Sequence, residues 1–147
     1  MSQTQSPAPG ETLIYPEEVL REKIRELAEV VISIRQLEHT VHENLNSIRT
    51  ILIKKLPPHK IIEYHEKILS EKDHIKQLVQ SAIDILIESA LQVDKDVEKY
   101  KRLYKVDFKC DNGHVIGVVL VKKGNKVRPV AIATNYASVN YCDRGDP

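Results

Sequence analysis

At 147 residues the chain has the length of one domain, or of one domain with an appendage. Its 22 lysine and arginine residues nearly balance its 21 aspartate and glutamate residues, so bulk charge predicts neither an obligatory nucleic-acid partner nor a membrane partner. Aromatic residues make up 5% of the chain and tryptophan is absent, which argues against an aromatic-lined pocket for a small-molecule substrate.

Residues 1–11 are polar and interrupted by proline and glycine, which predicts a disordered tail rather than a signal peptide. The longest apolar run, Val115 to Val121, has seven residues, whereas a membrane span needs about 18. We therefore expect an intracellular (cytoplasmic) or virion-associated protein without a membrane partner.

A helical pattern begins at Pro16, where the missing N–H costs nothing at the first helical position. Apolar residues then recur every three or four positions, at Leu20, Ile24, Leu27, Val31, Ile34, Leu37, Val41, Leu45, Ile48 and Leu52. This spacing predicts a long amphipathic helix. Weak helix formers gather in residues 40–47, so a kink there stays open.

Pro57 and Pro58 end that helix, because each proline disfavours helical angles in the residue before it. A second apolar stripe runs to Tyr104, with a possible break at residues 69–70. Two such stripes joined by a tight turn predict an antiparallel hairpin. The apolar surface is wider than a two-helix seam needs, which favours either a small helical bundle or self-association.

From Tyr104 the apolar residues alternate with polar ones, and this period of two indicates a strand. Residues 105–134 predict a three-stranded antiparallel β-meander with Val115–Val121 as its central strand and one face against the helices. Pro129 cannot donate a ladder hydrogen bond, so we expect the third strand at the edge. The fold class is thus α+β: a helical hairpin or bundle over 12–104, the meander over 105–134, and a polar tail over 135–147.

Catalytic and metal-binding patterns are weak. Glu38, His39, His42 and Glu43 could in principle offer two imidazoles and a carboxylate to a metal, but we interpret them as a solvated polar face with local ion pairs. Cys110 and Cys142 could form a disulfide or stay as free thiols, and both alternatives are open. We expect no enzyme activity, no metal and no cofactor.

Two basic segments stand out in this otherwise balanced chain. The turn between the helices carries Lys54, Lys55, His59 and Lys60, and the second predicted β-turn carries Lys122, Lys123, Lys126 and Arg128. Basic turns of this kind can contact phosphates. They can equally serve as charged edges that block strand pairing.

We expect a non-enzymatic interaction or assembly protein whose hairpin binds a second copy of itself or a larger complex. The alternative is a transcription regulator that acts on RNA polymerase or nucleic acid through the basic helical tip and the basic β-turn.

Abundant isoleucine, glutamate and lysine fit either a thermophile or an AT-rich genome. The composition of the helices is similar to that of small proteins of hyperthermophilic archaeal viruses, which include virion components and an RNA polymerase inhibitor. This resemblance rests on composition and implies no site residues. A helical hairpin on a small β-domain is also similar in outline to bacterial transcript-cleavage factors. The tip here is basic rather than acidic, so metal-assisted RNA cleavage does not carry over.

Overall fold

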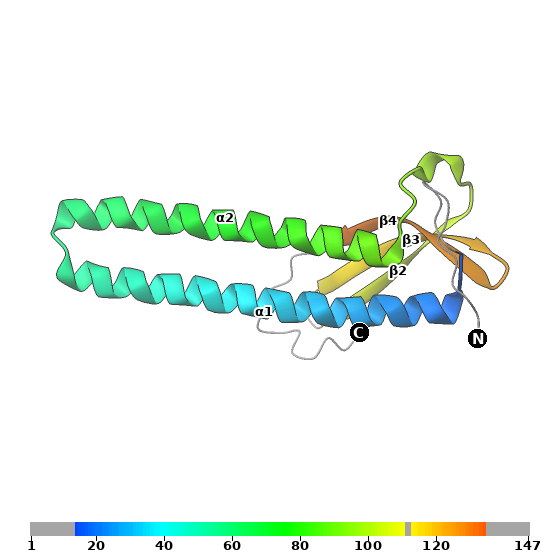
Figure 1. Cartoon of the computed structure of the whole chain (residues 1–147), viewed down its shortest axis with the longest axis horizontal. Coiled ribbons are helices and arrows are strands. Elements are labelled where there is room, and N and C mark those ends of the chain that lie inside the picture. The colour runs from blue at the N-terminus through cyan, green and yellow to red at the C-terminus, as the bar shows by residue number, and fades with distance from the viewer. Residues whose placement is uncertain (1–13, 111–112, 135–147) are drawn as a thin grey trace.

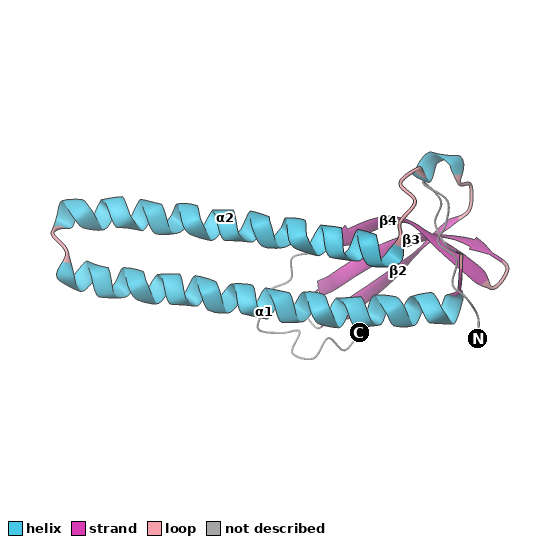
Figure 2. Ribbon diagram, in the orientation of Figure 1, coloured by secondary structure: helices cyan, strands magenta, loops and turns pink. Residues whose placement is uncertain are grey.

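The computed structural model describes residues 14–110 and 113–134, and it places two long helices before an antiparallel sheet (Figure 1). The predicted tails over 1–11 and 135–147 lie outside these residues, as does Cys142 and with it the question of a disulfide. The α+β class is confirmed (Figure 2).

Helix α1 spans Glu17–Lys55 and is unbroken across residues 40–47. Glutamates occupy its first turn and lysines its last turn, which suits the helix dipole at both ends. The hydroxyls of Thr40 and Ser47 donate to the carbonyl oxygens of Gln36 and Glu43, each at 3.1 Å. These weak helix formers therefore satisfy their polar groups inside the helix, and no kink results.

The two-proline turn reverses the chain as predicted. Leu56 and Pro57 are extended, and helix α2 begins with Pro58 and runs to Leu91 without a break at residues 69–70. The antiparallel hairpin is therefore confirmed, and within the described residues it is not folded into a larger bundle.

Helix α2 ends earlier than the apolar spacing suggested. Gln92 adopts left-handed angles (φ 52°), and the Asp94 carboxylate accepts the N–H of Asp96 at 2.9 Å, a local turn that competes with helix formation. The prediction that the stripe continues to Tyr104 is wrong. A short 3-10 helix, Val97–Lys99, and the start of strand β2 at Leu103 occupy that stretch instead.

The sheet has four strands rather than the predicted three. Strands β2 (Leu103–Cys110), β3 (Gly113–Lys123) and β4 (Lys126–Thr134) form the meander, with β3 central as expected. The added strand is β1, Tyr15–Pro16, which pairs antiparallel with Lys126 and Val127 of β4. Two residues are too few to show a period of two, so the sequence pattern could not reveal β1.

Because of β1, the prediction that β4 is the edge strand is wrong over its first residues. Pro129 lies beyond the reach of β1 and opposite Leu120, where the β3–β4 register shifts. The missing proline N–H therefore falls outside the β1–β4 pairing, as strand prolines require. Its carbonyl oxygen accepts the N–H of Asp94 at 3.0 Å and ties the segment after α2 to the sheet.

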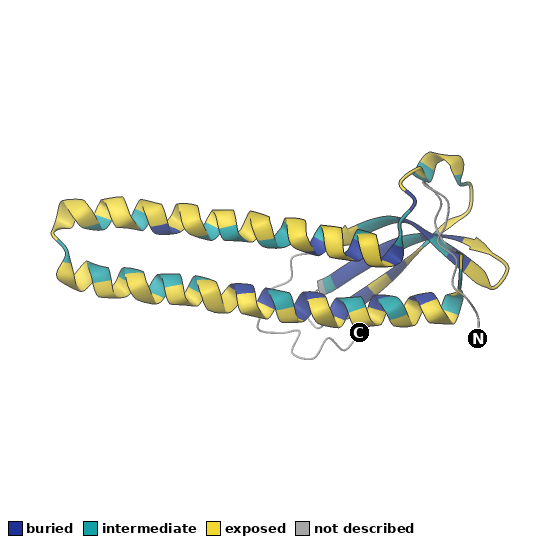
Figure 3. Cartoon of the chain, in the orientation of Figure 1, coloured by how far each residue is buried: buried dark blue, intermediate teal, exposed yellow. Residues whose placement is uncertain are grey.

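The core lies where the bases of both helices cover one face of the sheet, while the distal half of the hairpin extends past it (Figure 3). Its fully buried members come from every layer of the fold: Leu20, Ile24, Ile83, Ile87, Leu91, Ile116, Val118, Leu120 and Val127. Neither helix combines the length and the apolar character needed to cross a bilayer, within the residues described.

Candidate functional site

The structure places the two predicted basic segments at opposite ends of the molecule. Lys54, Lys55, His59 and Lys60 are exposed at the hairpin tip, where Lys60 pairs with Glu63 at 3.5 Å. Lys122, Lys123, Lys126 and Arg128 lie on the β3–β4 hairpin beside the helix bases (Figure 1). The 39 residues of α1 separate them by roughly 58 Å, at about 1.5 Å per residue. One compact ligand cannot touch both.

The β3–β4 turn instead forms one wall of a cleft of about 620 Å³, which we call the basic cleft. Its other wall is the segment between the 3-10 helix and β2. Six cationic side chains line it: Lys99, Lys101, Arg102, Lys122, Lys123 and Arg128. Lys126 is not among the lining residues.

Sequence reasoning missed Lys99, Lys101 and Arg102, although a signal was present. They immediately precede the strand that begins at Leu103, which pairs with Val121. Any cation just before Leu103 must then lie near the residues just after Val121. Strand pairing, rather than local sequence, assembles the cleft.

A buried carboxylate organises one side of the basic cleft. Asp94 is 6% exposed and does not line the cleft, but its carboxylate interacts with three residues that do. Its carboxylate accepts hydrogen bonds from Tyr100 Oη and from Lys99 Nζ, the latter at 3.2 Å, and Arg128 Nη1 lies 3.9 Å away. Arg128 also donates to Tyr100 Oη at 3.0 Å. The hydrogen bond from Tyr100 is the main reason that the pKa of Asp94 is lowered, with help from Asp96 N–H and Lys99 and against the effect of burial.

Asp94→Asn is expected to lower the free energy of unfolding by about 2 kcal/mol at neutral pH, since a buried charged acceptor is lost. The folded-state pKa of Asp94 lies below its unfolded value of about 3.9. This stabilisation is therefore fully present above that value and is lost as pH falls through the folded pKa. Urea unfolding at neutral pH and near pH 3 checks this, because the gap between wild type and variant should shrink in acid. A gap that acid leaves unchanged contradicts the assignment.

The cleft's cations are only partly neutralised. Lys122 contacts Glu17 at 3.3 Å, and Glu17 also binds Arg21, whose hydrogen bond is the first cause of the lowered pKa of Glu17. Over residues 14–110 and 113–134, no carboxylate lies within ion-pair distance of Lys101, Arg102 or Lys123. A net positive field is left in the cleft.

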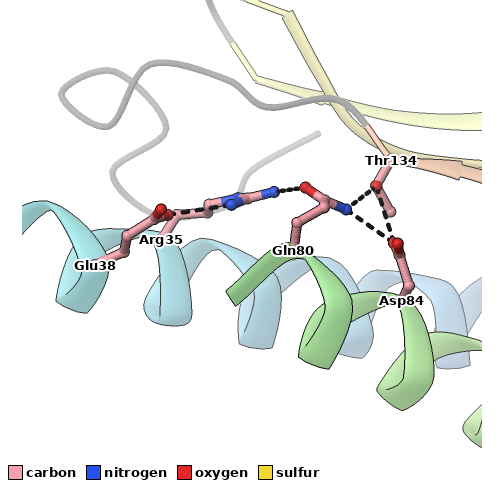
Figure 4. Close-up of polar contacts among 5 residues, drawn as sticks. All are labelled: Arg35, Glu38, Gln80, Asp84 and Thr134. Carbon is pink, nitrogen blue, oxygen red and sulfur yellow. Dashed lines mark hydrogen bonds and ion pairs between the residues drawn. The ribbon is translucent and has the colours of Figure 1, made fainter. Parts of the chain in front are cut away.

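A polar network joins both helices to the sheet and fixes which side of the hairpin faces it (Figure 4). Arg35 of α1 donates to Glu38 at 3.1 Å and to the side-chain oxygen of Gln80 of α2. Gln80 in turn donates to Thr134 of β4 and to Asp84, each at 2.8 Å. Arg35 and Gln80 therefore point to the sheet side.

Glu38 corrects one interpretation of the sequence. The sequence pattern predicts that Glu38 lies on a solvated polar face, but Glu38 is buried beside Arg35. His39 and Glu43 are exposed, with 3.9 Å between Nε2 and Oε2. Among the described residues, no three histidine, cysteine, aspartate or glutamate side chains lie close enough to hold a metal.

Beyond the sheet, the seam between the helices alternates apolar and polar layers. His65 and Lys72 fall where the α2 stripe should be apolar, and both are matched by α1. Arg49 Nε donates to His65 Nδ1 at 2.8 Å, and Lys72 Nζ donates to Asn46 at 3.0 Å. The distal hairpin is thus held together less by apolar burial than its base is.

The side of the hairpin away from the sheet is apolar and exposed. Leu37 follows Arg35 by two residues and Leu78 precedes Gln80 by two, so each is turned by about 200° from the sheet side. Leu37 is 67% exposed and Leu78 is 62% exposed. They lie at the same level of the antiparallel pair, because Arg35 and Gln80, two residues from each, are in contact.

Between residues 30 and 51 of α1 and between residues 75 and 89 of α2, the residues of this outward side repeat at helical spacing and include no charged side chain. On α1 they are Val30, Ser33, Ile34, Leu37, Thr40, Val41, Asn44, Ser47, Ile48 and Ile51; on α2 they are Ile75, Leu78, Ala82, Ile85, Leu86 and Ser89. We call this surface the charge-free face. Its α1 row 30, 34, 37, 41, 44, 48, 51 alternates steps of four and three, which is the heptad spacing of a helix–helix seam. In a chain with 29% charged residues, its neutrality is distinctive.

No known protein family, curated protein or solved structure matches the chain. We therefore infer its function from the geometry and chemistry of its surfaces.

Proposed function

We propose that this protein is a non-enzymatic assembly protein whose hairpins pair through their charge-free faces. The observation that carries the proposal is a second heptad row on α1, in which six of the seven residues are exposed and only Ile34 packs against the core. Such a row is the unit by which helices pack together. Two hairpins joined face to face form a four-helix bundle, in which these apolar side chains leave water.

The neutrality of the face favours a second copy over an unrelated partner. Partner-specific surfaces generally use complementary charges to select and orient their target, and this face has none. A symmetric pair brings each surface against itself, so any excess of one charge sign would repel. A charge-free face meets its own copy without that penalty.

The area of the charge-free face and its polar groups are also compatible with burial in a dimer interface. The face runs roughly 33 Å along α1 and 22 Å along α2, and with helices about 10 Å wide this gives about 550 Å² per copy. Two copies would then bury about 1,100 Å² in total, above the minimum of about 1,000 Å² for a specific interface. Thr40 and Ser47 already donate to their own helix, so burying them leaves no donor unsatisfied. The amide of Asn44 can pair across the interface and fix the register, as polar residues in heptad rows do.

Leu37→Glu is expected to abolish self-association and leave the fold intact. The wild type should sediment as a dimer, at twice the 16.8 kDa of one chain. Burying two unpaired carboxylates in the dimer should raise its dissociation constant by at least about 100-fold. The same change costs little in the monomer, because Leu37 is largely exposed. Sedimentation velocity and circular dichroism measure the two effects separately.

Ile62→Glu is the matched control. Ile62 is 64% exposed, close to Leu37, but it lies 18 residues, or five turns, before Gln80 and so on the sheet side of α2. It should leave the dimer unchanged. A wild type that is monomeric at every concentration, or a dimer lost with Ile62→Glu and kept with Leu37→Glu, would falsify the proposal.

Binding to a larger complex, and regulation of transcription through RNA polymerase, stay predictions. If the charge-free face serves a larger complex instead, Leu37→Glu will have no effect on the mass of the isolated protein.

A further inference from the structure

We infer that the basic cleft binds the phosphate backbone of single-stranded nucleic acid, a function separate from pairing through the helices. Six cations from two segments converge on it, and among the residues that the structure describes no acidic side chain lines it. Small-molecule sites of similar volume are lined mostly by hydrophobic and aromatic residues, whereas six of the nine residues that line this cleft are cationic. A phosphate-rich ligand is the chemistry that fits such a lining.

The cleft is organised before any ligand arrives. Asp94 binds Lys99 and Tyr100 and lies beside Arg128, so it restricts these side chains in the free protein. They therefore lose less conformational entropy when a ligand binds. Gly124 adopts left-handed angles (φ 63°) in the β3–β4 turn, which places Lys122 and Lys123 on the opposite wall. Side chains on these two walls can contact a nucleic-acid strand from both sides as it passes through the cleft.

Donor capacity remains for a ligand. Lys101, Arg102 and Lys123 have no carboxylate in ion-pair range among the described residues. Their ammonium and guanidinium groups can therefore donate to an anionic ligand without first breaking an ion pair.

The cleft favours a single strand, because a flexible chain can bend to place several phosphates against both walls. Its volume of about 620 Å³ suits a segment of drug-sized dimensions. A rigid duplex or a planar lipid headgroup layer cannot adjust its shape in this way.

Base stacking is not offered either. Lys99 lies 5.3 Å from the centre of the Tyr100 ring, and Lys122 lies 5.4 Å from that of Tyr104. With the rings occupied by lysines, recognition rests on phosphates and does not depend on base sequence.

Fluorescence anisotropy with labelled oligothymidylate tests the inference on the whole 147-residue chain. If three phosphates are contacted, affinity should fall roughly 20-fold between about 50 and 200 mM salt, from a slope near −0.7 per contact. The triple variant Lys101→Gln, Arg102→Gln, Lys123→Gln should lose most of this binding, and its log–log salt slope should become shallower by about 2. Oligoadenylate should bind like oligothymidylate.

The control removes equal charge at the other end of the molecule: Lys54→Gln, Lys55→Gln, Lys60→Gln. This tip variant should bind like the wild type. Equal weakening by both triple variants would show diffuse attraction and overturn the cleft assignment, as would absent salt-sensitive binding by the wild type. Tighter binding to a duplex, or to anionic phospholipid vesicles, would overturn the single-strand assignment. Both triple variants spare the charge-free face, so this outcome is independent of dimerisation.

Discussion

Glu38→Ala is expected to lower the free energy of unfolding by roughly 3 kcal/mol, because it removes one partner of a buried ion pair and leaves the other charge inside. Both side chains of the Arg35–Glu38 pair are almost fully buried. Urea unfolding followed by circular dichroism gives the value. The exposed pair Glu22–Arg25 has the same i,i+3 spacing on the same helix, so Glu22→Ala serves as the matched control and should change stability by less than about 0.5 kcal/mol.

Replacing both partners separates the charge effect from the packing effect. The double variant Arg35→Met, Glu38→Leu should recover most of the loss, because apolar residues of similar volume remove the cost of buried charge. A residual cost of about 1 kcal/mol is expected, since Gln80 loses the donor that Arg35 supplies. If Glu38→Ala is as mild as Glu22→Ala, the pair is not buried in solution.

Ile87→Ala is expected to cost about 2–5 kcal/mol, because the side chain is fully buried between α2 and the sheet and its removal leaves a cavity. Ile85 is two residues away on the same helix and 65% exposed, so Ile85→Ala should change monomer stability by less than about 0.5 kcal/mol. Both are measured by urea unfolding in the Leu37→Glu background, which keeps dimerisation out of the comparison.

The two isoleucines should respond in opposite ways when the dimer is allowed to form. In the wild-type background Ile85→Ala is expected to raise the dimer dissociation constant by about 10-fold, since each interface loses two copies of the side chain. Ile87→Ala should act on folding alone. A stable Ile87→Ala variant would mean that the sheet does not pack on α2 as described.

The sequence predicted those parts of the fold that long, regular patterns encode. The spacing from Leu20 to Leu52 and the pair Pro57-Pro58 suffice for an antiparallel hairpin, because periodicity and proline sterics act locally. The run Val115–Val121 predicted the central strand because such a strand is paired on both edges and is more buried than an edge strand.

The remaining parts depend on individual side-chain contacts and on strand pairing, neither of which follows from a periodic pattern. The end of α2 is set by Gln92 and by the Asp94 turn, against an apolar spacing that continues past them by coincidence. The basic cleft exists because the pairing of Leu103 with Val121 brings Lys101 and Arg102 to the β3–β4 turn. Burial of Glu38 depends likewise on Arg35, which neighbours it only in the folded helix. None of these can be read from local composition.

The polar layers of the distal seam divide one continuous pair of helices into two thermodynamic units. Toward the sheet, Ile24, Ile83 and Ile87 join the main core, and opening them exposes the sheet as well. Toward the tip, the two helices are joined by one hydrogen bond from Arg49 to His65 and one from Lys72 to Asn46. Water can replace both of these bonds. The arm can therefore open by local unfolding without loss of the base. The base of each hairpin is rigid, whereas its tip unfolds more easily. A second hairpin packed along it would stabilise the tip.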